Sequence, residues 1–242
     1  RQCQALRDMI VAARERPTNV LCLMGGKEFW SNGLNLNVIE ADERPAEASW
    51  ENINAMNDVV RELILTTDKV TVAAMQGNAG AGGVFLALAA DRVIAREGII
   101  MNPHYKNMGN LYGSEYWTYL LPKRSEAGAA IMERRLPIGA PEAKAAGLVD
   151  MLLGSEGFET DLRVYLAELA LASKDLIEAK QLRRREDEAQ KPLEDYRERE
   201  LERMKLNFFG FDPSYHVARY YFVHKTCHSR TPPYLAVHRK KG

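Results

Sequence analysis

Apolar positions in the first half of the chain follow two periods, one helical and one typical of buried strands. The opening segment is apolar at helical spacing, at Leu6, Met9, Ile10 and Ala13, and predicts a helix. The short apolar runs NVLCLMGG and KVTVAAMQG each end at glycine and predict buried strands. Between them, SWENINAMNDVVRELILTT predicts a helix with Ser49 as its N-cap.

The alternation continues after the second of these strands. GVFLALAAD is rich in small apolar residues and predicts a helix, while RVIARE and GIIMN predict two brief strands. APEAKAAGLVDMLL predicts a helix that starts at Pro141 and ends at Gly147, followed by a closing strand. This order of strands and helices predicts an α/β fold in which helices pack over a sheet.

The chain from residue 158 onward is mainly helical in pattern. Residues 158–204 are amphipathic at first and then densely charged, in QLRRREDEAQKPLEDYRERE, which predicts a solvated helix with intrahelical ion pairs. A further helix is expected near Asp212, before the basic tail HRKKG. We therefore expect a core over residues 1–155 and a C-terminal helical region of the same domain over residues 156–242.

Composition excludes several classes of protein. The 33 basic and 33 acidic residues balance to zero net charge, so no global charge favours nucleic acid. No apolar run approaches the roughly 18–20 residues that span a bilayer, and we expect a cytoplasmic protein with no membrane partner. Cys3, Cys22 and Cys227 stand too far apart for a paired motif, which favours a reducing compartment. The cluster of His224, Cys227 and His228 has too few ligands for a closed metal site, so no metal is expected.

A glycine-rich segment, QGNAGAGG at residues 76–83, joins a predicted strand to a predicted helix. Glycine lets a ligand approach the backbone amides closely, and a helix N-terminus offers unpaired N–H groups with partial positive charge. The segment therefore predicts a site for an anion or an oxyanion. Its spacing differs from the dinucleotide pattern G-x-G-x-x-G, and no Gly-Lys-Ser/Thr follows to form a phosphate loop. A tight turn with close helix packing is the structural alternative.

Three stretches together resemble the crotonase superfamily in their order and spacing. WSNGLNL at residues 30–36 is similar to that family's F-S/C-A-G-A-D-L/I segment, residues 76–91 to its glycine-rich segment, and residues 136–153 to its P-x-x-A-E-E-A-L-x-x-G-L-V segment. The resemblance implies a crotonase-like α/β fold, a spiral of ββα units with a C-terminal helical region, and a coenzyme A thioester as ligand. It also implies an oxyanion hole made by the backbone amides of Leu34 and Gly82, which would stabilise charge on the thioester oxygen.

Departures from the superfamily pattern bear on the activity and on the fold. Where family hydratases place their two catalytic Glu residues, this chain has Phe85 and, after Pro103, His104. Hydration needs an acid and a base to activate water and deliver a proton, so ordinary enoyl-CoA hydration is not expected. Family members also have strands before the opening helix, and we expect this core to lack those N-terminal strands.

Residues 102–109 and 111–119 resemble a narrower group, the crotonase-like domain of nickel–iron hydrogenase maturation factors. In that group an N-terminal formyltransferase-like domain passes the formyl group of formyl-tetrahydrofolate to CoA. The crotonase-like domain then splits formyl-CoA into CO and CoA. The resemblance implies catalytic roles for Tyr105 and Glu115, without deciding which of them is the acid and which the base.

Further site residues and partners follow from the same resemblance. His104, in the place of a family Glu, is an additional candidate, and Ser114 is expected to cap a helix that begins near Glu115. The phosphates of CoA need Arg or Lys, and Arg230 is the first candidate, beside Arg239, Lys240 and Lys241. The expected partners are a CoA thioester, the formyltransferase-like domain that this sequence lacks, and hydrogenase maturation proteins. Formyl-tetrahydrofolate would be used only by that missing domain.

Two other interpretations stay open at this point. Another CoA-thioester reaction, isomerisation or thioester hydrolysis, would use the same oxyanion hole. A non-catalytic CoA-binding scaffold would need only the binding pocket. Turnover of enoyl-CoA or acyl-CoA favours the first interpretation, and CoA binding without turnover favours the second.

Overall fold

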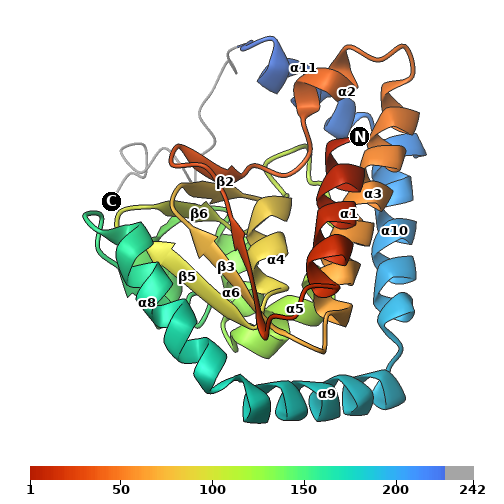
Figure 1. Cartoon of the computed structure of the whole chain (residues 1–242). Coiled ribbons are helices and arrows are strands. Elements are labelled where there is room, and N and C mark those ends of the chain that lie inside the picture. The colour runs from red at the N-terminus through yellow and green to blue at the C-terminus, as the bar shows by residue number, and fades with distance from the viewer. Residues whose placement is uncertain (227–242) are drawn as a thin grey trace.

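Two four-stranded sheets form the centre of the computed structural model, which describes residues 1–226 (Figure 1). The first sheet has the order β1-β3-β5-β8 and is parallel throughout; its strands are Val20–Met24, Val70–Met75, Arg92–Arg96 and Met151–Leu153. The second has the order β2-β4-β6-β7, with strands Phe29–Ser31, Asn78–Gly80, Ile100–Asn102 and Ile138–Gly139. In it, β6 and β7 pair antiparallel and the other pairs are parallel.

A ββα unit repeats along the chain. β1 and β2 lead into α2 (Leu36–Glu40) and α3 (Pro45–Leu65), β3 and β4 into α4 (Gly82–Leu88), and β5 and β6 into α5 (Trp117–Arg124). In each unit the first strand joins the first sheet and the second strand joins the second sheet. The expected crotonase-like α/β spiral of ββα units is therefore confirmed. The other helices before residue 155 are α1 (Gln2–Arg14), α6 (Gly128–Arg134) and α7 (Ala140–Ala145).

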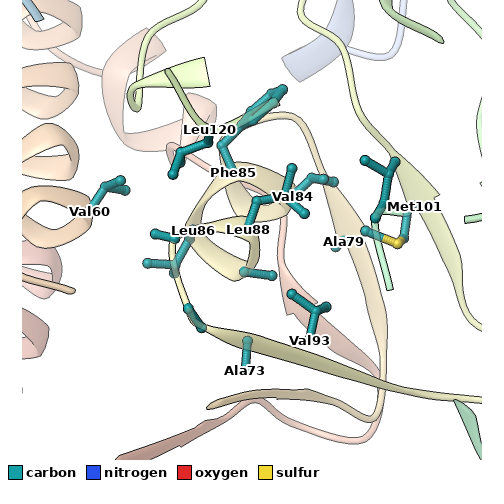
Figure 2. Packing of buried hydrophobic residues seen from close by; sticks show 14 of the residues in the cluster. Val60, Ala73, Ala79, Val84, Phe85, Leu86, Leu88, Val93, Met101 and Leu120 are labelled. Atoms are coloured by element: carbon teal, nitrogen blue, oxygen red, sulfur yellow. The ribbon is translucent and has the colours of Figure 1, made fainter. Parts of the chain in front are cut away.

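The side chains of β3 explain why the first sheet carries helices on both faces. Successive residues of a strand point to opposite faces, and every residue of β3 is buried. One set of its side chains packs with α8 (Phe158–Leu171). The alternate set, Ala73 and Met75, joins the larger cluster with α3 and α4. Figure 2 shows this side, with Leu88 of α4 and Val93 of β5 among the packed side chains.

The C-terminal helices wrap around this core. α9 (Ser173–Gln190) passes the end of the first sheet, α10 (Leu193–Phe209) runs alongside α3, and α11 (Ser214–Val223) packs on α2 (Figure 1). The charged stretch is helical, as expected. It is not simply solvated, however, because Glu200 is buried, and so is Lys180. The prediction of a solvated helix for residues 181–200 was therefore wrong at Glu200, which α10 turns toward the core; Lys180 lies just before this stretch, on α9.

Two other local predictions are corrected by the structure. α3 begins at Pro45, and Ser49 lies buried inside the helix rather than at its N-cap. There the Ser49 hydroxyl is 2.6 Å from the carbonyl oxygen of Pro45 and 2.8 Å from the hydroxyl of Tyr215. Proline is favoured in the first helical turn because it has no N–H to leave unpaired. β1 is only partly buried, because β3 is its single strand neighbour in the described part of the first sheet.

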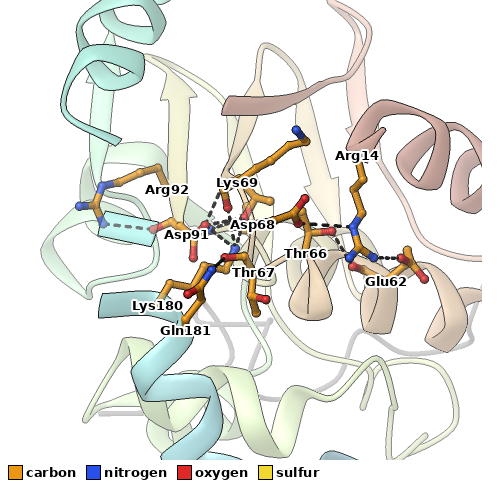
Figure 3. A network of polar contacts seen from close by, with 12 residues as sticks. Arg14, Glu62, Thr66, Thr67, Asp68, Lys69, Asp91, Arg92, Lys180 and Gln181 are labelled. Carbon is orange, nitrogen blue, oxygen red and sulfur yellow. Dashed lines mark hydrogen bonds and ion pairs between the residues drawn. The ribbon is translucent and has the colours of Figure 1, made fainter. Parts of the chain in front are cut away.

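Lys180 ties α9 to the core through a polar network (Figure 3). Its ammonium group donates to the carboxylate of Asp91 at 2.7 Å and to the carbonyl oxygen of Lys69 at 3.2 Å. Asp91 also accepts the backbone N–H of Thr71 at 2.7 Å. A buried ammonium group is stable only when it is paired and hydrogen-bonded, and both conditions are met here.

Replacing Lys180 with Met is expected to lower the free energy of unfolding by about 3 kcal/mol, because it leaves the Asp91 carboxylate partly buried without its cation. Arg134→Met provides a matched control, since Arg134 and its partner Glu142 are both about half exposed. Its cost is expected to stay below about 1 kcal/mol. Denaturant unfolding followed by circular dichroism measures both changes. Equal losses in the two variants would contradict a structural role for the buried pair.

Candidate active site

A cavity of about 970 Å³ opens where the loops after β2, β4 and β6 meet α10 and α11. Helical residues such as Phe208 and Tyr215 form an apolar part of its wall. The loops contribute the residues that the sequence singled out: Leu34, Gly82, His104, Tyr105 and Glu115. The fold therefore gathers residues from three ββα units around one space.

Two turns bring the backbone of Leu34 and of Gly82 to the wall of this cavity. Gly33 has a φ of +75°, a conformation that glycine adopts without strain, and it turns the chain just before Leu34. Gly82 is the first residue of α4, where a backbone N–H has no partner within the helix. A Cβ built on Gly33 would lie 3.4 Å from the nitrogen of Gly82, so the two turns are in contact. Two amides placed in this way could bind a single oxygen atom.

Tyr105 and Glu115 form a hydrogen-bonded pair in the same cavity. The Tyr105 hydroxyl donates to Oε2 of Glu115 at 2.7 Å, and both side chains are buried. The N–H of Ser114 donates to the same oxygen at 3.2 Å. The other oxygen, Oε1, lies so close to Gly82 that a Cβ there would be 2.3 Å away. The carboxyl of Glu115 thus lies between the Tyr105 hydroxyl and the start of α4.

Phe85 occupies the position of a hydratase Glu and has a packing role. It is fully buried, and its ring stacks on that of Tyr105 with centroids 5.3 Å apart and an interplanar angle of 14°. On another side, Gly113 has a φ of +92°, and a Cβ there would lie 2.1 Å from the Tyr105 ring. Phe85 and Gly113 therefore fix the plane of the tyrosine.

His104, at the second position of a hydratase Glu, is buried beside the cavity. Within residues 1–226, neither ring nitrogen has a hydrogen-bond partner of regular geometry. Burial lowers the pKa of His104, and its contact with the backbone of Arg135 opposes this shift only in part. A neutral imidazole at this place can donate one hydrogen bond to a bound ligand and accept another.

Burial also moves the pKa values of the central pair. Loss of solvent raises the pKa of Glu115 to about 7; the hydrogen bond from Tyr105 opposes the shift, and the charge of Glu200 adds to it. Loss of solvent and the neighbouring Glu115 carboxylate raise the pKa of Tyr105 well above its usual value of 10. Glu115 is therefore the member of the pair that can gain and lose a proton near neutral pH.

Ser114 lies at the site but does not cap a helix. α5 begins at Trp117, with no side-chain hydrogen bond at its N-cap Tyr116. The Ser114 hydroxyl instead contacts Asn57 and Glu200, and the carboxylate of Glu200 accepts the N–H of Tyr116 at 2.9 Å. Sequence reasoning missed Asn57 and Glu200, because nothing in their own segments separates them from ordinary polar helix positions.

Several residues that the sequence singled out for CoA or metal binding lie outside the described part of the chain. Arg230, the candidate for CoA phosphates, lies outside the described residues, as do Arg239, Lys240 and Lys241, and Cys227 and His228. Lys225 is a described cation in the cavity lining. Among residues 1–226, no three His, Cys, Asp or Glu side chains lie together so as to hold a metal ion. Over the same range, every helix is too short or too polar to cross a membrane.

The fold and the sequence together define the class of this protein. The chain belongs to the enoyl-CoA hydratase/isomerase family, whose profile matches residues 4–225. An enoyl-CoA hydratase from Bacillus halodurans has a similar structure, with a TM-score of 0.76 over 90% of this chain and 88% of that one. At 20% sequence identity, this likeness shows the fold alone.

Relatives of higher identity are hydrogenase maturation factors. The chain is 56% identical over 243 residues to the hydrogenase maturation factor HoxX of Bradyrhizobium diazoefficiens, covering 98% of the chain and 43% of that protein. A variant of HypX from Aquifex aeolicus matches with a TM-score of 0.95 and 51% identity, over 99% of this chain and 44% of that one. HypX from the same organism in complex with tetrahydrofolic acid matches with a TM-score of 0.94, 52% identity and the same coverage. The chain thus spans less than half the length of these relatives.

Proposed function

We propose that this chain splits formyl-CoA into carbon monoxide and CoA, and that it serves hydrogenase maturation as a part of a HypX/HoxX-type protein. The observation that carries the proposal is the buried Tyr105–Glu115 pair beside Gly82, in a cavity where both hydratase acids are replaced. High identity to HoxX and HypX over nearly the whole chain supports the biological setting.

The proposed reaction balances without an oxidant or a reductant. Formyl-CoA has no α-carbon, so the enolate route of other family members is closed to it. The C–H bond of the formyl group breaks and its electron pair stays on carbon, while the C–S bond breaks and its electrons leave with sulfur. The proton from carbon ends on the thiolate, which gives one CO and one CoA thiol.

Within this scheme the two side chains take different roles. Glu115, with a pKa raised to about 7, removes the formyl proton as a carboxylate and returns it to sulfur. Tyr105 stays protonated, because its pKa is raised well above 10, and its hydroxyl holds Oε2 of Glu115 so that Oε1 faces the substrate. The amides of Leu34 and Gly82 bind the formyl oxygen as charge develops on it.

The folate-dependent step belongs to a different part of the relatives. One HypX structure carries tetrahydrofolic acid, and this chain covers 44% of that protein. We assign formyl transfer from formyl-tetrahydrofolate to CoA to a formyltransferase-like domain outside the present sequence. The cavity described above would then receive formyl-CoA from that domain.

Purified full-length protein is expected to release CO from formyl-CoA and to leave crotonyl-CoA unhydrated, with at least about a 10²-fold preference, because Phe85 and His104 replace both hydratase acids. CO is trapped with reduced haemoglobin, and hydration is followed by loss of the enoyl absorbance. Turnover of crotonyl-CoA in place of formyl-CoA would overturn the proposal in favour of another thioester reaction. CoA binding without any turnover would favour a scaffold.

A further inference from the structure

A second carboxylate lies behind the reacting pair, on a helix from the far end of the sequence. Glu200 of α10 has an exposed fraction of 0% and is more than 80 positions from the loop that it touches. It does not line the cavity, so it has no direct access to a substrate there. Its contacts are instead with residues 114–118, the turn that carries Glu115.

Four donors converge on the Glu200 carboxylate. Oε2 accepts the N–H of Tyr116 at 2.9 Å and lies 3.3 Å from the hydroxyl of Ser114. Oε1 accepts the N–H of Thr118 at 2.8 Å and the hydroxyl of Thr118 at 2.6 Å. Each oxygen of Glu200 therefore accepts a backbone N–H. A Gln side chain of the same shape would turn its NH₂ group toward one of these N–H groups, and the two donors would clash. The arrangement therefore suits an ionised carboxylate.

The turn that Glu200 holds has an unusual backbone. Glu115 and Tyr116 have φ values of +62° and +58°, in the left-handed region that non-glycine residues rarely occupy. Such conformations persist only where surrounding contacts impose them. Asn57 of α3 supplies one of these contacts, since its Oδ1 accepts the N–H of Glu115 at 2.8 Å. Glu200 supplies the contact at Tyr116, so helices α3 and α10 hold the turn from two directions.

The same placement brings the charge of Glu200 to bear on the carboxyl of Glu115. The titratable groups facing Glu115 are Tyr105 from the loop after β6, Cys3 from α1 and Glu200 from α10. Burial raises the pKa of both Glu115 and Glu200 to about 7. Glu200 has four donors, and Glu115 has two, both at Oε2. As pH falls, the first proton therefore goes to Glu115, and Glu200 keeps the negative charge.

We propose that Glu200 is a positioning residue for Glu115: it fixes the strained 114–118 turn and places a second negative charge behind the reacting carboxyl. The expected effect of Glu200 on CO release rests on the proposed function, whereas its expected effect on the pKa of Glu115 does not. The charge of Glu200 disfavours a carboxylate at Glu115. Glu115 consequently exchanges its proton near neutral pH, and a general base is most efficient when its pKa lies near the working pH.

Glu200→Gln removes this charge and is the principal test. The titration of Glu115 is expected to move about 1 pH unit toward acid, because the nearby charge that opposed ionisation is gone. Infrared difference spectroscopy during a pH titration follows the protonated carboxyl band directly, and Glu115→Gln identifies which band belongs to Glu115. The acid limb of kcat/KM for CO release is expected to move by the same amount, with kcat falling about tenfold as the turn loosens. Glu198→Gln, exposed on the same helix, is the matched control and should change neither quantity.

The amide introduced by Glu200→Gln would face a backbone N–H, so a gentler variant accompanies it. Thr118→Val removes one donor from Oε1 while keeping Glu200 in place. With one donor fewer, the Glu200 carboxylate is less stabilised and takes up a proton more readily. Its charge then opposes the ionisation of Glu115 less, so the titration of the Glu115 band should move toward acid by less than in Glu200→Gln. An unchanged Glu115 titration in both variants would overturn the inference. The infrared shift without any CO release from wild-type protein would support it while refuting the proposed reaction.

Discussion

Glu115→Gln is expected to lower kcat for CO release from formyl-CoA by about 10²–10⁴-fold, the range for loss of a positioned general base. Gln keeps the shape of the side chain and its contact with the Tyr105 hydroxyl but cannot take up a proton. Since the pKa of Glu115 is raised to about 7 and the carboxylate is the active form, wild-type kcat/KM should rise with pH through that value. This acid limb should disappear in the variant.

The control for this prediction is Glu126→Gln, because Glu126 is exposed beyond the end of α5 and faces solvent. Its kcat should equal that of wild type. Stopped-flow detection of carbonmonoxy-haemoglobin gives kcat, and equilibrium binding of CoA shows whether the cavity is intact. A Glu115→Gln protein that binds CoA and releases CO at the wild-type rate would remove Glu115 from the mechanism.

Gly82→Ala is expected to lower kcat by at least about 10²-fold, a loss of the size found when one oxyanion donor is removed. The added Cβ would lie 2.3 Å from Oε1 of Glu115, so either the carboxyl or the start of α4 must move. Both displacements separate the amide of residue 82 from the carboxyl that acts with it. The loss should therefore appear in kcat more than in the affinity for CoA.

Gly154→Ala is the matched glycine control. A Cβ there would be 3.6 Å from the nearest atom, the carbonyl oxygen of Glu156, which is an ordinary contact. The rate of this variant should stay within about twofold of wild type, since a surface substitution of this kind changes stability by only a few tenths of a kcal/mol. Full activity of Gly82→Ala would show that the close approach of Gly82 and Glu115 does not matter for the reaction.

The sequence predicted the fold best where local signals and the family pattern agree. Strand β3 and helix α4 follow from a short apolar run, a glycine-rich turn and a small-residue segment, and both are present. Pro141 and Gly147 marked the start of α7 and the turn after it for steric reasons that hold in any context. Ser49 misled because a serine four residues into a helix can bond back to the preceding turn as readily as it can cap.

The candidate site was predictable only in part. Leu34 and Gly82 lie in motifs whose spacing could be aligned, whereas Tyr105 and Glu115 came from resemblance, since their loop has no periodicity. Glu200 could not be found, because a charged helix has the same sequence pattern whether a given Glu faces solvent or a buried turn. Its burial depends on how α10 packs along α3, a tertiary contact that the residues of α10 do not encode locally.

The products formed from formyl-CoA test the central claim most directly. Full-length protein should release one CO for each CoA thiol and no formate, because in the proposed reaction Glu115 removes the formyl proton and no water attacks the thioester. CO is measured as carbonmonoxy-haemoglobin, the thiol with Ellman's reagent and formate with formate dehydrogenase in the same sample. Formate equal to the thiol, with no CO, would contradict the account and make the protein a thioester hydrolase.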